Sequence, residues 1–253
     1  MKKYILTLIL ALASLGLYAQ TNRNKTIINA ALHGWEYEIK AGVNLGGTAP
    51  LPFPEEIRSI DGYNPTLSIT IEGNMTKWLD TKKKWGIITG LRLENKGMRT
   101  KATVKNYNME IIGYDGNRLK GNWTGGVRTK VQNSYITIPV LAAYKLSPRT
   151  TLKLGPYFSY LMDGDFSGHV YEGYLRETNP TGDKINFTNG AIATYDFSGD
   201  LRKFQWGVQA GVDWKAFKHL KVHADLNWGL NDIFNKDFKT VTFDMYAIYL
   251  NVT

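Results

Sequence analysis

Residues 203–214, KFQWGVQAGVDW, alternate between two kinds of side chain without a break. One set of alternate positions is aromatic or apolar: Phe204, Trp206, Val208, Ala210, Val212 and Trp214. The interleaved set is polar or small: Lys203, Gln205, Gly207, Gln209, Gly211 and Asp213. Because successive side chains of a strand point to opposite faces, this pattern predicts a strand with one apolar and one polar face. The length suits a strand that crosses a bilayer, which needs about 9–11 residues, better than a soluble strand of about 5–6 residues.

Seven further segments carry a similar alternation. They lie at about 36–46, 66–76, 85–95, 134–146, 151–162, 220–230 and 241–253. Ile88 breaks the alternation in the third of the eight strands, and the last segment has apolar residues on both faces. Pro139 and Pro156 fall inside two neighbouring segments, and proline cannot donate a ladder hydrogen bond. We therefore expect a bulge or gap where these two segments pair.

The connections between the eight segments alternate strictly between long and short. They run to roughly 19, 8, 38, 4, 40, 5 and 10 residues. Outer-membrane barrels have short periplasmic turns and longer extracellular loops. The sequence therefore predicts an all-β fold: an eight-stranded antiparallel transmembrane β-barrel with two long extracellular loops.

The first residues resemble an export signal. Two lysines follow the first methionine, an apolar run extends from Tyr4 to Leu17, and Ala19 provides the small residue expected before a signal-peptide cleavage site. This pattern is typical of a cleaved secretory signal peptide, and the run is short for a retained membrane anchor, which is the alternative. We expect a signal peptide at 1–19, a periplasmic N-terminal tail at 20–35 and an outer-membrane β-barrel domain at 36–253.

Composition narrows the function classes. The chain has no cysteine, which excludes disulfides and thiolate metal sites. No second apolar run reaches 18 residues, so later membrane crossings must be made by strands. The formal charge is +9, or +7 without Lys2 and Lys3. A basic chain can bind nucleic acid, but an export signal argues against a nucleic-acid partner.

Five short stretches resemble the PorT-type outer-membrane β-barrel proteins of Bacteroidetes. They are KAGVN at 40–44, YITIPV at 135–140, GPYFSYL at 155–161, GVQAGV at 207–212 and WGLNDI at 228–233. The resemblance implies an eight-stranded outer-membrane barrel that tolerates both prolines, and it implies no single activity. The namesake of the family assists a protein secretion system. Such barrels usually end on an aromatic residue, whereas this sequence ends in Asn251, Val252 and Thr253.

The polar face of the strands predicts a charged lumen. Its members are Lys40, Glu72, Arg92, Glu94, Lys153, Lys203, Asp213, Lys221, His223 and Asp225. An eight-stranded barrel is just filled by its own side chains, so these charges should pair with one another rather than line a wide pore. A narrow conduit is the alternative. His223 and Asp225 share a face and could serve acid–base chemistry in a barrel hydrolase, although no nearby serine supports such a site.

The two long connections carry opposite charge. Residues 96–130 hold eight lysines and arginines against two acids, and residues 163–200 hold seven acids against two cations. The two segments could dock on each other as a lid. Alternatively, the basic segment could contact lipopolysaccharide phosphates or an acidic partner. The candidate contact residues are Arg99, Lys101, Lys105, Arg118, Lys120, Arg128 and Lys130.

These patterns favour a non-enzymatic outer-membrane protein with a binding or scaffolding role at the cell envelope. The expected partners are outer-membrane lipid, lipopolysaccharide and envelope or secretion-system proteins. A narrow porin-like channel for small solutes and a barrel hydrolase are the alternatives. No catalytic, metal or cofactor residues are assigned, and no cofactor is expected, because no His or carboxylate spacing makes a metal site.

Overall fold

The computed structural model describes residues 35–113, 116–238, 240–241 and 243–253. The expected signal peptide at 1–19, and the expected tail up to residue 34, lie outside these described residues. The described residues form ten strands: β1 (Trp35–Pro50), β2 (Ile57–Pro65), β3 (Ser68–Trp78), β4 (Trp85–Ile112), β5 (Arg118–Lys145), β6 (Thr150–Glu177), β7 (Lys184–Asp196), β8 (Phe204–Lys215), β9 (Lys221–Gly229) and β10 (Met245–Val252). A short 3-10 helix, η1 (Ser198–Asp200), follows β7. In the described part of the chain, no helix is both long enough and apolar enough to cross a membrane.

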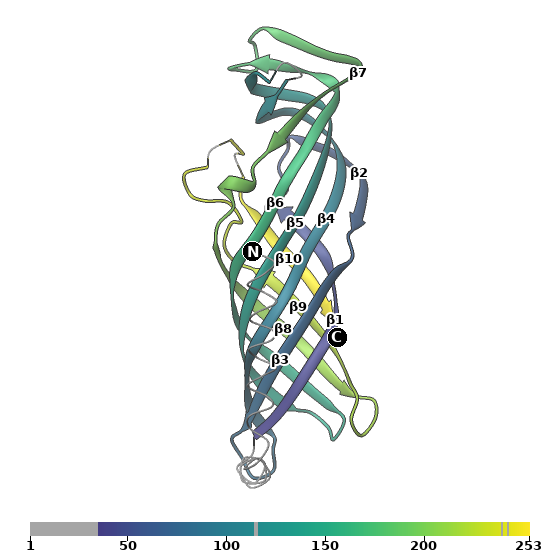
Figure 1. Cartoon of the computed structure of the whole chain (residues 1–253), viewed down its shortest axis with the longest axis vertical. Helices are drawn as coiled ribbons and strands as arrows, with labels where there is room; N and C mark the ends of the chain where they lie inside the picture. Colours follow the sequence, from purple (N-terminus) through teal and green to yellow (C-terminus); the bar gives the residue numbers. More distant parts are fainter. Residues whose placement is uncertain (1–34, 114–115, 239, 242) are drawn as a thin grey trace, which may run out of the picture.

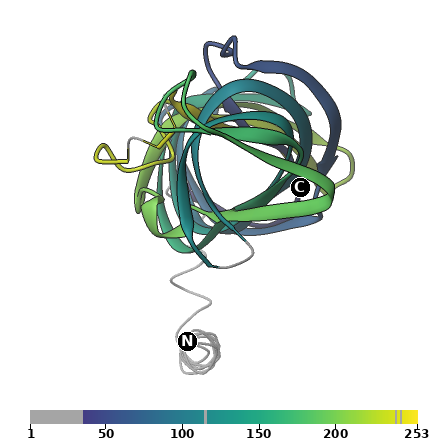
Figure 2. The ribbon, with the colours of Figure 1, turned by 90° about the horizontal axis from the view of Figure 1, so that it is seen from above.

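Eight of the strands close into an antiparallel ring. The ring runs β1, β3, β4, β5, β6, β8, β9 and β10, and β10 returns to β1 through pairs such as Asn44 with Asn251. Figure 2 shows the ring from above, and Figure 1 shows its strands tilted to the long axis. The eight expected segments correspond to these eight strands, so the predicted barrel is confirmed.

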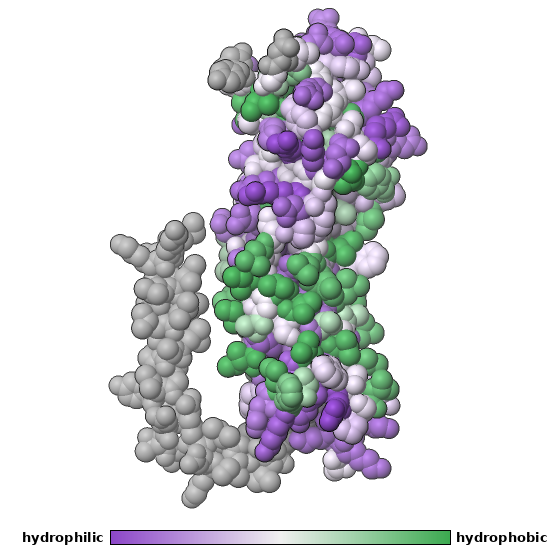
Figure 3. Space-filling view, turned by 90° about the vertical axis from the view of Figure 1, so that its right-hand side faces the viewer, coloured by the Kyte–Doolittle hydropathy of each residue, from purple (hydrophilic) through white to green (hydrophobic). Residues whose placement is uncertain are grey.

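The outward face of the ring is apolar around the middle of the molecule. Large exposed side chains on this face include Ile39, Ile71, Leu91, Trp206 and Trp228. Figure 3 shows hydrophobic (green) surface gathered in a band across the middle and lower part of the molecule, with hydrophilic (purple) surface above and below it. This arrangement reverses that of a soluble protein and suits a wall that faces lipid.

The two expected long loops are largely strand, which corrects that part of the prediction. β4, β5 and β6 each run for 28 residues, or roughly 90 Å at about 3.3 Å per residue. They therefore continue far above the apolar band, where β2 pairs with β4 and β7 pairs with β6 (Figure 1). We call this region the upper tier: residues 97–112, 118–133 and 163–177, together with β2 and β7.

The polarity of the strands inverts where the upper tier begins. On β4, Arg92, Glu94 and Lys96 point into the ring and are buried. The inward positions that follow on the same strand include Met98 and Val104, which are buried and apolar. The outward positions change in the opposite sense, from leucines in the band to exposed cations above it. The upper tier therefore follows the rule of a water-soluble fold, with apolar residues inside.

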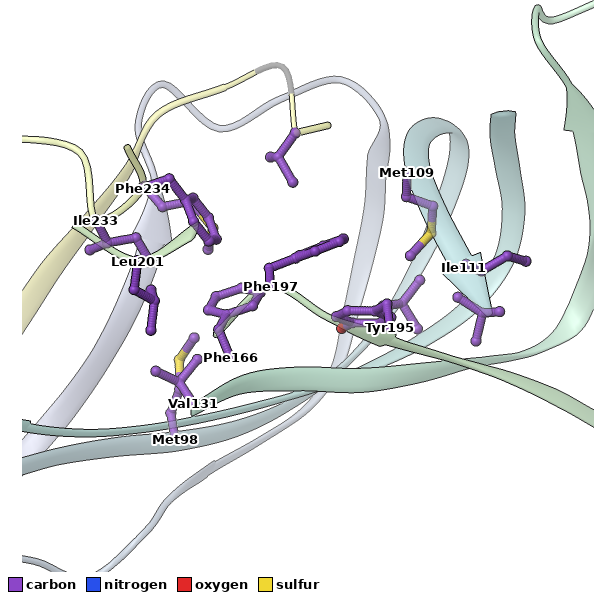
Figure 4. Close-up of a cluster of buried hydrophobic side chains, with 14 of the residues drawn as sticks. Met98, Met109, Ile111, Val131, Phe166, Tyr195, Phe197, Leu201, Ile233 and Phe234 are labelled. Carbon is purple, nitrogen blue, oxygen red and sulfur yellow. The ribbon is translucent and has the colours of Figure 1, made fainter. Parts of the chain in front are cut away.

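An apolar core fills the upper tier. Phe166 lies with its ring centroid 5.0 Å from that of Phe234 and 6.3 Å from that of Phe197. Figure 4 shows these rings in the centre of the core, with Met109 and Ile111 beside Tyr195. Phe234 comes from the connection between β9 and β10 and forms a bridge with Leu201. The core therefore ties that connection to the long strands.

The two prolines leave a gap in the ladder between β5 and β6, as expected. Pro139 pairs with Tyr157 and Ala142 pairs with Leu154 in the same register, but the two intervening pairs are missing. On the other edge of β6, the ladder with β8 is unbroken, and Pro156 lies opposite Val208.

Candidate functional site: the charged lumen and a basic outer surface

The lumen at the level of the apolar band is filled by paired charges. Its ion pairs join five cations to five carboxylates in the described part of the chain. The cations are Lys40, Arg92, Lys96, Lys153 and Lys221, and the carboxylates belong to Glu38, Glu72, Glu94, Asp213 and Asp225. Equal numbers of opposite charge offset the high cost of taking each ion out of water.

Arg92 stands at the centre of this network. Its Nε donates to Glu72, and its Nη2 donates to Gln209 Oε1 at 2.8 Å. Nη1 lies 3.8 Å from Glu94 Oε2 and 3.3 Å from Asn227 Oδ1. The Arg92 side chain is fully buried. Because it starts from β4 and contacts Gln209 of β8 and Asn227 of β9, the guanidinium crosses the lumen and joins opposite walls.

A second group lies nearer the short connections. Lys153 Nζ lies 2.5 Å from Asp213 Oδ1 and 2.8 Å from Asp225 Oδ1. His223 Nδ1 is 2.6 Å from Asp213 Oδ1, and its Nε2 is 3.3 Å from Glu38 Oε1. His223 therefore contacts Asp213 and Glu38, whereas Asp225, which shares its face of β9, is engaged by Lys153. Both ring nitrogens of His223 meet carboxylates, which leaves neither to activate a nucleophile.

A layer of tyrosines covers the lumen at its upper end. Lys96 Nζ lies 5.2, 5.3 and 5.7 Å from the ring centroids of Tyr135, Tyr157 and Tyr249. The same ammonium is 3.1 Å from Glu94 Oε1. A cation near aromatic faces is stabilised by the ring electrons. This layer separates the polar lumen from the apolar core above it.

The described side chains pack closely across the lumen at the level of Arg92. Arg92, Thr137 and Gln209 are 0% exposed, although they come from three different strands. Ions would therefore have to displace a paired network, which makes the channel alternative unfavourable.

Two residues of the predicted network lie away from its centre. Lys203 is exposed, because β8 begins only at Phe204, and its assignment to the lumen is corrected. Lys221 lies at the rim and pairs with Glu38 at 3.2 Å. Sequence reasoning left Glu38 and Lys96 out of the network, although both share the inward parity of their strands.

Glu38, Asp213 and His223 offer ligand atoms within 4.8 Å of one another, as a metal site would require. The surrounding cations oppose such a role. Lys153 contacts Asp213, and Lys221 contacts Glu38. With these ammonium groups in place, the cluster is better described as part of the ion-pair network.

A cluster of cations lies on the outward face of the upper tier. Arg99 pairs across the β4–β5 ladder with Lys130, and Lys101 pairs with Arg128. We call these four residues the basic patch. Arg99, Lys101 and Arg128 are exposed, and Lys130 is half-buried and lies 2.5 Å from Asp165 Oδ2. Lys101 and Arg128 also lie against the ring of Tyr171 from β6.

The other expected contact residues lie elsewhere. Lys105 is exposed further up β4. Arg118 pairs with Glu110 at 2.8 Å, and together with Lys120 they line a recess shared with Asp196, Asp200 and Asp237. Opposite charges of the two long connections therefore meet at this recess and at the contact of Lys130 with Asp165, whereas the rest of the basic patch faces outward.

His169 follows the patch on β6, opposite Arg128. Partial burial and the neighbouring Arg128 guanidinium both lower the pKa of His169 below its ordinary value. The imidazole is therefore neutral at neutral pH and adds no charge to the patch there.

A closed ring with an apolar outer band and a polar, filled interior defines the class of outer-membrane β-barrels. The family model described as outer membrane protein beta-barrel domain matches residues 18–235, and the chain belongs to this family. Membership supports a location in the outer membrane. No curated protein matches the chain.

Proposed function

We propose that the chain is a non-enzymatic outer-membrane barrel that binds the phosphate groups of lipopolysaccharide through its basic patch. In this proposal the upper tier faces the outside of the cell and the short connections face the periplasm, as in other barrels of this class. The protein would then have a binding or scaffolding role at the cell envelope.

The observation that carries this proposal is the pairing of like charges across one ladder. Arg99 lies opposite Lys130, and Lys101 lies opposite Arg128. Like charges directly opposite each other in a sheet are destabilising. Asp165 offsets only part of this charge through Lys130. Phosphate groups bound by the guanidinium and ammonium groups would offset the rest.

The position of the patch also supports a phosphate ligand. Arg99 follows Leu93, the last exposed leucine of the band on β4, by six residues. Six residues correspond to about 20 Å along a tilted strand. The patch therefore stands above the hydrocarbon region, where the charged parts of surface lipids lie.

Envelope and secretion-system proteins are the other partners suggested by the resemblance to PorT-type barrels. The basic patch would also suit an acidic protein, and measuring lipopolysaccharide capture alongside protein crosslinking distinguishes the two partners. The closed lumen favours binding over conduction, and the occupied nitrogens of His223 favour a non-enzymatic role.

The test uses the protein in nanodiscs and a charge-reversal variant, Arg99→Glu/Lys101→Glu/Arg128→Glu. The matched control, Lys82→Glu/Lys84→Glu/Lys218→Glu, makes the same change in charge at exposed lysines beside the short connections. Capture of purified lipopolysaccharide is measured against lipopolysaccharide with its phosphates removed. We expect the patch variant to lose at least about tenfold in affinity, since each charged hydrogen bond contributes roughly 1.5–3 kcal/mol.

The control should bind like the wild type, and removal of the phosphates should weaken wild-type binding to a similar extent. Equal capture by wild type and patch variant would overturn the proposal. Loss of a crosslinked envelope protein with lipopolysaccharide capture unchanged would assign the patch to a protein partner instead.

A further inference from the structure

The barrel wall has a seam on one side of the upper tier. β1 pairs with β3 only as far as Asn44, which lies opposite Ser68. Above this point β1 continues to Pro50, and its free edge meets side chains in place of a strand. The Thr48 N–H donates to Met98 Sδ at 3.2 Å, and the Gly46 carbonyl accepts from the Tyr63 hydroxyl at 2.6 Å.

A cavity of about 360 Å³ lies behind this seam. Gly47 and Ile248, from the outward face of β1 and β10, form one wall. Met98 and Ala102 of β4 form the facing wall. The remaining lining is also predominantly apolar, and the volume lies in the range of small-molecule sites, about 300–1,000 Å³.

The cavity opens to the outside. Phe53, Ile60 and Tyr63 line it and are 56%, 50% and 50% exposed. Large apolar side chains gathered at an open cavity mark a binding site more often than scattered ones do.

The lipid-facing band leads directly into this cavity. Leu45 and Leu250 lie opposite each other across the β1–β10 ladder, and both are exposed in the band. The next outward pair on the same two strands is Gly47 with Ile248, which lines the cavity. The absence of a side chain at Gly47 leaves space between the band and the cavity, because a Cβ there would stand only 2.7 Å from Met98 Sδ.

We propose that the cavity holds one acyl chain of a lipid from the surrounding leaflet, which enters sideways through the seam between β1 and β4. A peptide would bring backbone N–H and C=O groups that an apolar lining leaves unsatisfied, whereas a hydrocarbon chain has none. The proposal concerns the chain of a lipid and requires neither the basic patch nor phosphate, so it stands apart from the function proposed above.

The first experiment maps where a lipid chain lies. Hexadecanoic acid with a diazirine in mid-chain is added to the protein in nanodiscs, irradiated, and the labelled residues are identified by mass spectrometry. We expect labels at Met98, Tyr63 and Phe243, in addition to the band. Ala102→Trp fills the cavity and should reduce the cavity labels by at least about tenfold. Ala191→Trp, at an exposed position of β7, is the matched control and should leave them unchanged.

The second experiment locks the seam. The chain has no cysteine, and a Cβ at Gly47 would lie 3.8 Å from Met98 Cβ, which is close to the mean Cβ separation in disulfides of about 3.8 Å. The variant Gly47→Cys/Met98→Cys can therefore be closed with an oxidant and reopened with a reductant. We expect the oxidised form to lose labelling in the cavity, to keep labelling at Leu45 and Leu250, and to recover fully on reduction.

Absence of cavity labels in the wild type would overturn the proposal. Cavity labelling that is the same in the oxidised and reduced forms would overturn entry through the seam. A change in gel mobility on heating checks that each variant has folded, and the reversible lock gives a result even if Ala102→Trp does not fold.

Discussion

Gly211 lies directly opposite Asp225 in the β8–β9 ladder, and a Cβ on Gly211 would stand only 1.8 Å from Asp225 Oδ1. Lys153 lies opposite Gly211 on the other side, in the β6–β8 ladder. The missing side chain on β8 therefore gives the Asp225 carboxylate room to reach Lys153 over Gly211.

We expect Gly211→Ala to destabilise the barrel by about 1–3 kcal/mol, because the added methyl group must displace a buried, paired carboxylate. Gly73→Ala is the matched control, since a Cβ at this strand glycine meets no atom within 4 Å. Urea unfolding in detergent, followed by tryptophan fluorescence, measures both. Equal midpoints for the two variants would contradict the packing described here.

Arg92→Leu should destabilise the barrel far more than loss of an ion pair at the rim. Removal of the guanidinium leaves Glu72 and Glu94 buried without their common partner, at a cost of about 3–5 kcal/mol. Adding Glu72→Gln to Arg92→Leu should recover part of this loss. The control is Lys83→Met, which breaks a half-exposed pair with Glu36 and should cost less than about 1 kcal/mol.

The wild-type protein should pass no steady current in a planar bilayer. The Arg92 layer and the tyrosines around Lys96 close the lumen at two successive levels. A general porin in the same lipid serves as the positive control. A stable single-channel conductance from the purified barrel would restore the channel alternative.

Phe234→Ala should loosen the upper tier while the ring remains closed. Phe234 is 1% exposed and packs edge-to-face on Phe166, so its removal should cost about 3–5 kcal/mol locally. We expect faster proteolysis between β9 and β10 with the heat-modifiable gel mobility retained. Phe217→Ala, at an exposed position in the β8–β9 connection, should change neither property.

Period-two alternation was enough to predict the ring. Outward residues such as Trp206 and inward residues such as Arg92 follow one parity within the band, and the spacing of short and long connections set the order of the strands. Lys203 was misplaced because a pattern extended by one residue cannot show where a strand begins.

The upper tier was missed because the apolar parity changes after Lys96. Met98, Ala102 and Val104 still alternate with Arg99, Lys101 and Lys105, but the apolar set now falls on the inward face. A search for strands with an apolar outward face does not find this stretch, and its cations make it resemble a charged loop. The two partners of His223 differ in this respect. Asp213 lies directly opposite His223 in the β8–β9 ladder, so this contact follows from the register of one hairpin. Glu38 reaches His223 from β1, which lies beside β9 only through β10, so this contact depends on closure of the ring.

The inversion of polarity between Lys96 and Met98 also fixes how deeply the protein is immersed. Moving the cylinder along its axis so that the upper tier entered the bilayer would bring Arg99 and Lys130 towards hydrocarbon, where a cation costs roughly 2–4 kcal/mol at the bilayer midplane. Moving it the other way would expose the tryptophans and leucines of the band to water. The residues of β4, β5 and β6, which run through both the band and the upper tier, therefore set the depth at which the barrel lies in the bilayer.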